Sequence, residues 1–505
     1  MNTPYFNSYA GAPFLGDTEG ILKLRALVRS GRDAISKATT YQIGTPPDSG
    51  NDLVSFLPED LSKVFAEQTR GDMQIVATKQ VPTVTASSTQ HYMTVQQSDG
   101  DTPYIPNFQA ETGLSGLRTA TATKPYVYLK QHADRRQSTE TAQQVGLIGG
   151  LYAMGVPQVK RDGLAKMLRD AVRAKRKAFE RDLLWASSEV NDLEFDSIPD
   201  QIDVDGIPDL NVFDLRGAAL TWEYLFDKIA LNAGSKYGTM TEKIWLTPRQ
   251  WGQLGIQAND SGRWDRQYTG KAVPEGKGWV FNPSAMGITG PLGQFIKLDV
   301  VPFLDAASIY EYITSSVGTP AQTVTIANQT SAAAGGSGSY FTSADAGDYI
   351  YGVVAIFANG SSAGYTTAAI PVTAGQEVTI TMNDAAIGTS DNPLYAYAVF
   401  RSSKDGDDTT LKFLKRYPVK NSGGHTVMVD DNSVLPGTDK TLGLQIGARE
   451  AGDGGAINIP TLLEPVRFPL PVNTFVGVQQ ITLSIQAPKV WLPYRQFLIK
   501  NCGVS

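Results

Sequence analysis

Two extended segments without a core of their own place the strongest constraint on what this chain can fold into. MQIVATKQVPTVTASSTQHYMTVQQSDGD (73–101) and TGLSGLRTATATKPYVYLKQHADRR (112–136) are rich in Thr and polar at alternate positions. They flank a middle that contains Asp101, Gly113 and Gly116, and the whole pattern predicts a long two-stranded hairpin over residues 71–136. Because an isolated hairpin is marginal in water, it is expected to find its partners elsewhere, most simply on a neighbouring subunit.

Length and composition indicate a folded soluble protein with several domains. A chain of 505 residues is too long for one ordinary core. The formal net charge of −6 argues against a dedicated nucleic-acid-binding protein. A single cysteine, Cys502, excludes an internal disulfide framework and is expected to be a buried thiol. The start of the chain lacks a secretory pattern, and the longest apolar run, 349–358, is about half of the ~20 residues that span a bilayer, so neither export nor membrane contact is expected.

The first half of the chain shows helical patterns. Residues 1–70 resemble an arm with two modest helices. GLAKMLRDAVRAKRKAFERDLLWAS (163–187) has an apolar stripe and predicts a helix roughly 35–40 Å long. NDLEFDSIPDQIDVDGIPD (191–209) predicts an acidic linker, and FDLRGAALTWEYLFDKIALNAG (213–234) predicts a helix that begins near its Asp and ends before its Gly.

Strands alternate with helices between residues 195 and 316, which predicts a compact α/β or α+β domain. TEKIWLTPRQWGQLG (241–255) predicts a buried strand followed by a helix, with Thr247 as the cap and Pro248 in the first turn. Such a turn carries catalytic loops in some enzymes and is plain scaffold in other proteins. We expect scaffold here, with Trp245 and Trp251 as packing residues.

The composition changes again over residues 317–441. Short β-rich runs are separated by Gly, Ser, Asn and Asp at intervals of about 8–12 residues, which predicts a β-sandwich. YIYGVVAIFANGSSA (349–363) and YAYAVFRS (395–402) resemble strands of immunoglobulin-like and fibronectin type III domains. Long apolar strands return over 442–505, so the sandwich is expected to be inserted into another domain.

No motif indicates catalysis. The three histidines, His91, His132 and His425, lie in the predicted hairpin and sandwich, and no G-x-S-x-G elbow is present. Neither an enzyme activity nor a cofactor is therefore expected. Five carboxylates of the acidic linker would suit calcium, but they lack the EF-hand spacing, so a solvated loop is favoured and a metal-dependent enzyme stays an open alternative: Asp196, Asp200, Asp203, Asp205 and Asp209.

The predicted long helix carries a run of basic residues. One interpretation is a solvated face. The other is a face turned toward packaged nucleic acid, bound weakly through phosphates and strongly salt-dependent, because acids nearby reduce its field. The candidate residues of this second interpretation are Lys166, Arg169, Arg173, Lys177 and Arg181.

The order of these parts resembles the major capsid proteins of tailed bacteriophages, which have the Hong Kong 97 fold. KIWLTPRQWGQL (243–254) is similar to the strand and helix of the axial domain in that family, and KVWLPYRQFLIKNCG (489–503) is similar to its closing peripheral strand. The resemblance implies an α+β capsid fold with an inserted all-β sandwich. Its parts would be an N-terminal arm (1–70), an extended hairpin or E-loop (71–136), a peripheral domain with a spine helix (137–194), an axial domain (195–316), an immunoglobulin-like insertion (317–441) and a return to the axial and peripheral domains (442–505).

The resemblance implies a head protein that self-assembles, as hexameric and pentameric capsomers, into an icosahedral shell enclosing double-stranded DNA. Portal, scaffolding and decoration proteins would be its partners, and the virion, assembled in the host cytoplasm, its location. Some members cross-link subunits, which makes Lys124, Lys130 and Asn501 candidates without support from their spacing. The alternative is a virion surface, tail or fibre protein that binds carbohydrate or a host receptor through sandwich tyrosines such as Tyr340, Tyr365 and Tyr395.

Overall fold

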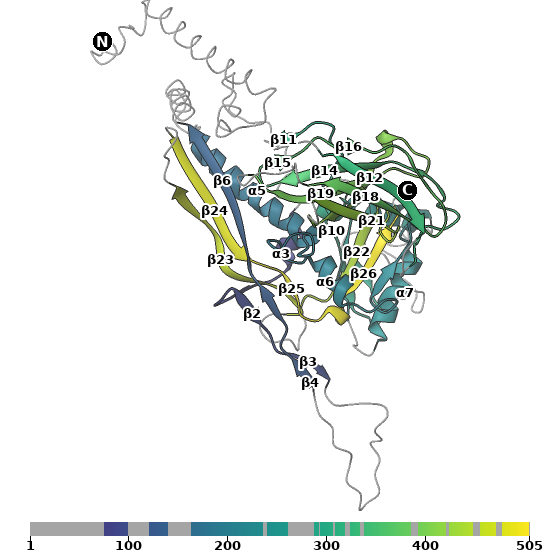
Figure 1. Cartoon of the computed structure of the whole chain (residues 1–505). Helices are drawn as coiled ribbons and strands as arrows, with labels where there is room; N and C mark the ends of the chain where they lie inside the picture. Colours follow the sequence, from purple (N-terminus) through teal and green to yellow (C-terminus); the bar gives the residue numbers. More distant parts are fainter. Residues whose placement is uncertain are drawn as a thin grey trace, which may run out of the picture. The chain divides into compact units, whose positions relative to one another are not determined.

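The structure is a computed structural model, drawn in Figure 1. It describes residues 75–98, 121–139, 163–235, 240–260, 287–291, 293–306, 309–318, 324–333, 338–384, 392–420, 424–447, 455–470 and 477–503. The arm predicted over 1–70 and the hairpin tip at 99–120 lie outside these residues. The described residues fall into two compact units, one from the ranges 70–132, 175–465 and 483–505, and one from 133–174 and 466–482. None of the helices among them is long and apolar enough to cross a membrane.

A mixed six-stranded sheet organises the α/β part of the chain. Its strand order is β7-β26-β22-β8-β10-β9. The strands are β7 Val212–Asp214, β8 Lys243–Leu246, β9 Gly287–Thr289, β10 Phe295–Val300, β22 Asp439–Leu444 and β26 Phe497–Cys502. Helices α7 (Trp222–Ala233) and α8 (Pro248–Asp260) share a core with this sheet, in which Leu225, Leu254 and Cys502 are fully buried. The expectation of a buried thiol is confirmed, and burial raises the pKa of Cys502 to about 12.

The Thr-Pro turn before α8 is scaffold. Thr247 Oγ1 accepts from Gln250 N at 3.2 Å, and Gln250 Oε1 accepts from Thr247 N at 3.0 Å, which is a reciprocal capping box. The Thr247 hydroxyl also donates to Asp439 Oδ2 at 2.6 Å, so the turn is tied to the first residue of β22. Trp245 is fully buried and Trp251 packs against the core, as the sequence predicts for packing residues.

Two predictions for the α/β part are wrong in detail. The helix expected from about Asp214 begins at Trp222, where Thr221 caps it, while residues 212–214 form β7. Arg216 and Gly217 have φ of 49° and 85°, so the chain turns between the strand and the helix. The expected acidic linker contains a helix, α6 (Ile198–Asp205), because Ser197 caps it by accepting from Asp200 N and a proline stands in its first turn.

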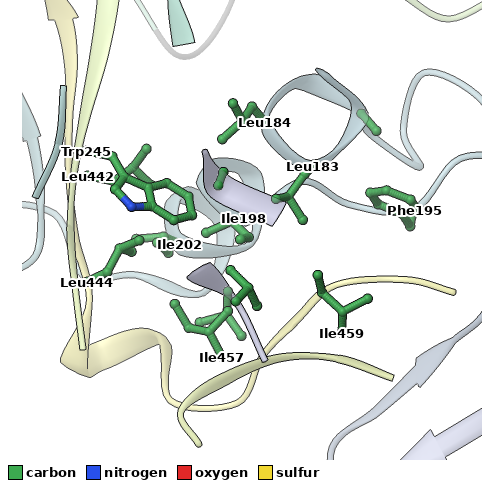
Figure 2. Packing of buried hydrophobic residues seen from close by; sticks show 14 of the residues in the cluster. Leu183, Leu184, Phe195, Ile198, Ile202, Trp245, Leu442, Leu444, Ile457 and Ile459 are labelled. Carbon is green, nitrogen blue, oxygen red and sulfur yellow. The ribbon is translucent and has the colours of Figure 1, made fainter. Parts of the chain in front are cut away.

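The long helix predicted over 163–187 is confirmed as α5 (Gly163–Trp185). Its C-terminal half buries Leu183 and Leu184 completely. Figure 2 shows these two leucines in one cluster with Ile198 of α6, Trp245 of β8 and Ile457 of β23. The end of α5 is therefore a packing centre for segments that are far apart in the sequence.

The chain leaves the mixed sheet after β10 and re-enters it at β22. We call the described residues of 317–438, which lie in between, the β-rich segment. They form three sheets, with the strand orders β11-β15-β14-β19-β20 (β16 pairs with β14), β12-β18-β21 and β13-β17. One core joins the first two sheets, with Tyr351 and Val353 from β14 and Ile380 from β18 fully buried. Every pairing in the segment is antiparallel. The predicted boundary at 441 falls inside β22.

The strands of the β-rich segment are β11 Val317–Gly318, β12 Ile326–Ala333, β13 Gly347–Tyr349, β14 Tyr351–Phe357, β15 Gly360–Ser361, β16 Tyr365–Thr366, β17 Ile370–Val372, β18 Gln376–Asn383, β19 Leu394–Arg401, β20 Lys412–Tyr417 and β21 His425–Asp430. Three 3-10 turns complete the described helices: η3 Pro302–Leu304, η5 Asp408–Thr410 and η7 Pro493–Arg495.

The remaining elements belong to the predicted hairpin and to the strands beside it. They are α3 Ala77–Gln80, β1 Thr83–Thr85, β2 Gln90–Tyr92, β3 Val95–Ser98, β4 Thr121–Thr123, β5 Tyr126–Tyr128, β6 Lys130–Thr139, β23 Ile457–Leu470, β24 Gly477–Gln486 and β25 Lys489–Val490. One sheet has the order β1-β23-β24-β6, with β25 on β23. β2 pairs with β5 and β3 pairs with β4, each as a two-stranded ribbon.

Candidate functional site: an anchored hairpin with an exposed tyrosine face

The short helix α3, which precedes the first strand of the hairpin, is anchored by one buried carboxylate. Glu180 of α5 is fully buried, and its Oε1 accepts from the backbone N–H groups of Val76 at 2.9 Å and Ala77 at 2.6 Å. Its Oε2 accepts from Thr78 N at 2.7 Å and from the Thr78 hydroxyl. A carboxylate that receives four hydrogen bonds satisfies the free N–H groups at the start of α3 and fixes the base of the hairpin on α5.

The descending strand is held by the same helix. Lys175 Nζ donates to the carbonyl oxygen of His132 at 2.9 Å. The imidazole of His132 lies edge-on to Phe179, with ring centroids 5.5 Å apart, and 5.4 Å from the ring of Phe195. Burial lowers the pKa of His132, against the opposing charge of Asp182, whose Oδ2 is 3.9 Å from His132 Nδ1. The histidine is therefore neutral in the folded chain near pH 7.

The base of the hairpin packs on its own chain. β1 runs parallel to β23, pairing Thr83 with Ile459, and Ala86 and Leu129 are buried in the core that surrounds the end of α5. The expectation that the whole hairpin finds its partners outside the chain is wrong for this base. The reason is that the mostly polar hairpin sequence contains a few small and apolar residues, such as Ala86 and Leu129, which pack into the core beside β23 and α5.

Farther out, the ribbon β2–β5 has two different faces. His91 and Val127 are opposite each other and face inward: the His91 ring lies 5.8 Å from that of Trp491, and Val127 packs against the core. The opposite face carries Tyr92, Tyr126 and Tyr128, which are 55%, 50% and 54% exposed. Their rings contact one another in series, with centroids 5.9 Å and 5.3 Å apart. We call these three residues the tyrosine face.

The tyrosine face is exposed in the described part of the chain. Its two strands pair only with each other among the described residues, and the next ribbon, β3–β4, is likewise two-stranded. The face was not singled out from the sequence, although the alternation Tyr126-Val127-Tyr128 on a strand is the signal that would have shown it. Glu180 and Lys175 were missed because nothing local distinguishes an anchoring charge on a basic helix from a solvated one.

The five basic residues proposed to face nucleic acid lie along α5 at helical spacing. The side chains of Lys166 and Arg169 lie outside the described part of the helix, and Arg173 has an interaction partner. Arg181 pairs with Asp182 at 3.0 Å, and Lys177 is half-buried. The nucleic-acid face stays a prediction.

The acidic residues suggested as metal ligands separate onto different partners. Asp196 accepts from Ser188 N at 2.8 Å, Asp200 accepts from the Ser187 hydroxyl at 3.1 Å, and Asp203 pairs with Lys500 at 2.9 Å. Asp205 and Asp209 are exposed. Among the residues that the structure describes, no three Asp, Glu, His or Cys side chains gather so as to hold a metal ion.

The residues considered for a cross-link and for receptor binding lie in different environments. Asn501 is 4% exposed, and its amide donates to Asp214 and to the Ser433 carbonyl, both at 2.9 Å, so it is not presented for a cross-link with Lys124 or Lys130. Arg216 stacks on the exposed ring of Tyr340 at 5.1 Å, and Tyr365 is 41% exposed. Tyr395 is half-buried, and burial followed by the charge of Glu194 raises its pKa.

No family model matches the chain, and no curated protein matches it. Solved structures do match in outline. The capsid of Myoviridae phage XM1 has a TM-score of 0.42 at 6% identity, over 87% of this chain and 96% of that one. An encapsulin complex from Synechococcus elongatus has a TM-score of 0.35 at 8% identity (88% and 94% covered), and the capsid of cyanophage P-SCSP1u has 0.35 at 7% (91% and 97% covered). All three TM-scores lie below 0.5.

Proposed function

We propose that the chain is a shell-forming protein, the major head protein of a bacteriophage, which self-assembles through its hairpin. One observation carries this proposal: a ribbon with an exposed tyrosine face is fixed at its base by a fully buried carboxylate. Tyrosine is enriched where proteins bind proteins, because it buries a large ring and keeps a polar end. A ribbon anchored so firmly and still unpaired along its face is suited to lie on another molecule.

A second copy of the chain is the partner best matched to the ribbon. The described outer hairpin, residues 83–98 and 121–132, contains Lys124 and Lys130 and has no Asp or Glu, whereas the whole chain carries a net charge of −6. The ribbon and the chain as a whole are thus opposite in net charge, which favours contact between copies. A contact between two different surfaces of identical chains can close into rings, which are the units of a shell.

The finer features follow the resemblance to tailed-phage head proteins. They are hexameric and pentameric capsomers, an icosahedral shell around double-stranded DNA, weak phosphate contact by the basic face of α5, and portal, scaffolding and decoration proteins as partners in the virion. The β-rich segment is proposed as an immunoglobulin-like insertion, which is supported by the two larger of its three antiparallel sheets sharing one core. The domain boundaries predicted from the sequence belong to this proposal, except that the insertion ends at 438, before β22.

Removing the tyrosine face tests the proposal. The variant Tyr92→Ser, Tyr126→Ser, Tyr128→Ser is expected to stay folded and to raise the concentration needed for assembly by at least about tenfold, since truncating one interface tyrosine can cost about 2 kcal/mol. Size-exclusion chromatography with light scattering and negative-stain microscopy would measure assembly. The matched control is Tyr365→Ser, an exposed tyrosine on β16 of the β-rich segment.

Two outcomes would count against it. If the wild-type chain stays monomeric at high concentration while its hairpin is ordered, the proposed shell function is wrong. A triple variant that forms particles as readily as wild type would mean that the tyrosine face is not the contact. If instead deletion of the β-rich segment abolished binding to host cells or carbohydrate, the alternative of a receptor-binding virion protein would be favoured.

A further inference from the structure

The loop between α5 and α6, residues 186–197, lies between the β-rich segment and the base of the hairpin. We call it the connecting loop. Its own hydrogen bonds close it: Ser197 N donates to Ala186 O at 2.9 Å, Ser188 N to Asp196 Oδ1 at 2.8 Å and Ser187 N to Glu194 Oε2 at 3.0 Å. The loop is thus one hydrogen-bonded unit.

The β-rich segment grips one side of this loop. Arg416 of β20 donates to both oxygens of Glu194 at 2.7 Å and to the carbonyl of Trp185 at 2.8 Å. The two charged side chains are 11% and 12% exposed, so this bidentate pair is largely removed from water. Asn191 adds a hydrogen bond of 3.2 Å to the Tyr395 carbonyl of β19.

Aromatic side chains seal the same contact. Phe413 of β20 stacks on Tyr310 with centroids 4.2 Å apart and lies edge-on to Trp185 at 6.1 Å. Trp185 also donates to the Phe303 carbonyl at 2.7 Å, which joins the end of α5 to the residues just after β10. The β-rich segment is therefore seated on the α/β part by packed rings and a buried ion pair rather than joined to it by the chain alone.

The hairpin occupies the other side of the loop. Lys130 Nζ donates to the carbonyl oxygen of Asp192. Phe195 of the loop packs on His132 at 5.4 Å and on Phe179 at 5.9 Å. Asn191 and Glu194 bind the β-rich segment, whereas Asp192 and Phe195 bind the hairpin. One short loop therefore contacts both parts of the chain.

We propose that the β-rich segment positions the base of the hairpin through the connecting loop. The Arg416–Glu194 pair holds the loop in place, and the loop in turn seats Lys130 and His132. This role is independent of the proposed shell function, because it concerns how one copy of the chain holds its own hairpin.

Hydrogen exchange on the unassembled full chain tests the positioning role. Glu194→Gln and Arg416→Gln are each expected to speed amide exchange in the peptide 126–132 by at least about threefold, because loosening one contact face lowers the local free energy of opening. The double variant is expected to do no more than the stronger single one, since the two residues act as one pair. The tyrosine-face triple variant serves as the background if the wild type assembles.

The matched control is Lys415→Gln, which removes one positive charge from the neighbouring exposed position of β20. Peptides from β18 and β21 report whether the β-rich segment itself stays folded. Asn191→Ala removes the hydrogen bond to the Tyr395 carbonyl and the one accepted from Leu193 N, and it leaves the ion pair intact, so it provides a second variant if an ion-pair variant does not fold. Exchange in 126–132 that is the same in Glu194→Gln, Asn191→Ala and Lys415→Gln would overturn the proposal, whether or not the wild type forms shells.

Discussion

At the scale of single residues, a few polar groups packed at its base decide how the hairpin is held. His132 is the clearest case, because its ring is enclosed by Phe179 and Phe195 and its Nε2 has no hydrogen-bond partner among the described residues. In the folded chain the imidazole of His132 therefore packs as an aromatic ring. The cost is that the site rejects the proton which a free histidine would bind below about pH 6.5.

The stability of the unassembled chain should therefore depend on pH through His132. Because burial lowers its pKa from 6.5, the contribution of His132 is fully present above that pH and is lost as the pH falls toward the lowered value, where the unfolded chain binds a proton and the folded chain does not. The slope cannot exceed about 1.4 kcal/mol per pH unit for one proton. Burial also raises the pKa of Asp439 to about 6, which adds a slope of opposite sign. The difference between wild type and His132→Gln in urea unfolding between pH 7 and 5 would therefore measure the His132 contribution.

His132→Gln is expected to flatten this pH dependence, and His91→Gln, a change at a second hairpin histidine, provides the comparison. An unchanged slope in His132→Gln would show that another group titrates in this range.

At the scale of elements, α5 is the part on which the hairpin depends. Its apolar stripe buries Leu183 and Leu184, while Glu180 and Lys175 of the same helix bind the start of α3 and the carbonyl of His132 in β6. One helix therefore contributes both to the core and to the anchor. Its polar residues near the core are not a solvated face, as the helical pattern alone would suggest.

Glu180→Gln should destabilise the chain by about 3 kcal/mol, because an amide cannot accept all four hydrogen bonds and its NH2 group faces donors. Chemical denaturation would show the loss, and faster amide exchange at 76–78 would locate it. Arg176→Gln, at an exposed position on the same helix, is expected to change stability by less than about 0.5 kcal/mol. Equal stability of Glu180→Gln and wild type would show that Glu180 does not anchor the hairpin.

At the scale of the whole molecule, the β-rich segment is seated firmly enough that deleting it has a cost. Removing 319–437 uncovers Trp185, Tyr310 and Tyr312, which pack against the segment, and leaves Glu194 without Arg416. A bare deletion is therefore expected to aggregate. Tyr310→Ser, Tyr312→Ser and Glu194→Gln, added to the deletion, should restore solubility.

The repaired deletion is expected to assemble, but only at a higher concentration than the full chain, because its hairpin base is held less firmly. Light scattering against concentration would measure this. Assembly at the wild-type concentration would show that the seating of the hairpin base does not limit assembly. A variant that folds and never assembles would place the segment itself in the contact between subunits.

Local patterns were sufficient for much of the fold. The stripe of α5, the Thr-Pro-Arg-Gln start of α8 and the β-rich character of 317–438 are all visible in short windows, and the structure confirms them. The helix expected near Asp214 starts later because Thr221, and not the Asp, is the cap. The helix α6 was not predicted, because the many acidic residues of this stretch suggested a solvated linker. Its start nevertheless carries two helix signals, the cap Ser197 and a proline in the first turn.

The sequence by itself determined the elements with a local cause: periodicity, caps and turn residues, together with the long polar hairpin. Only the tertiary structure decided which charges are anchors and which faces are free. Glu180 meets residues about 103 positions away, and Arg416 meets Glu194 across 222 positions. Such pairs have no signature within any window, because burial and geometry, rather than neighbours in the chain, give these side chains their roles.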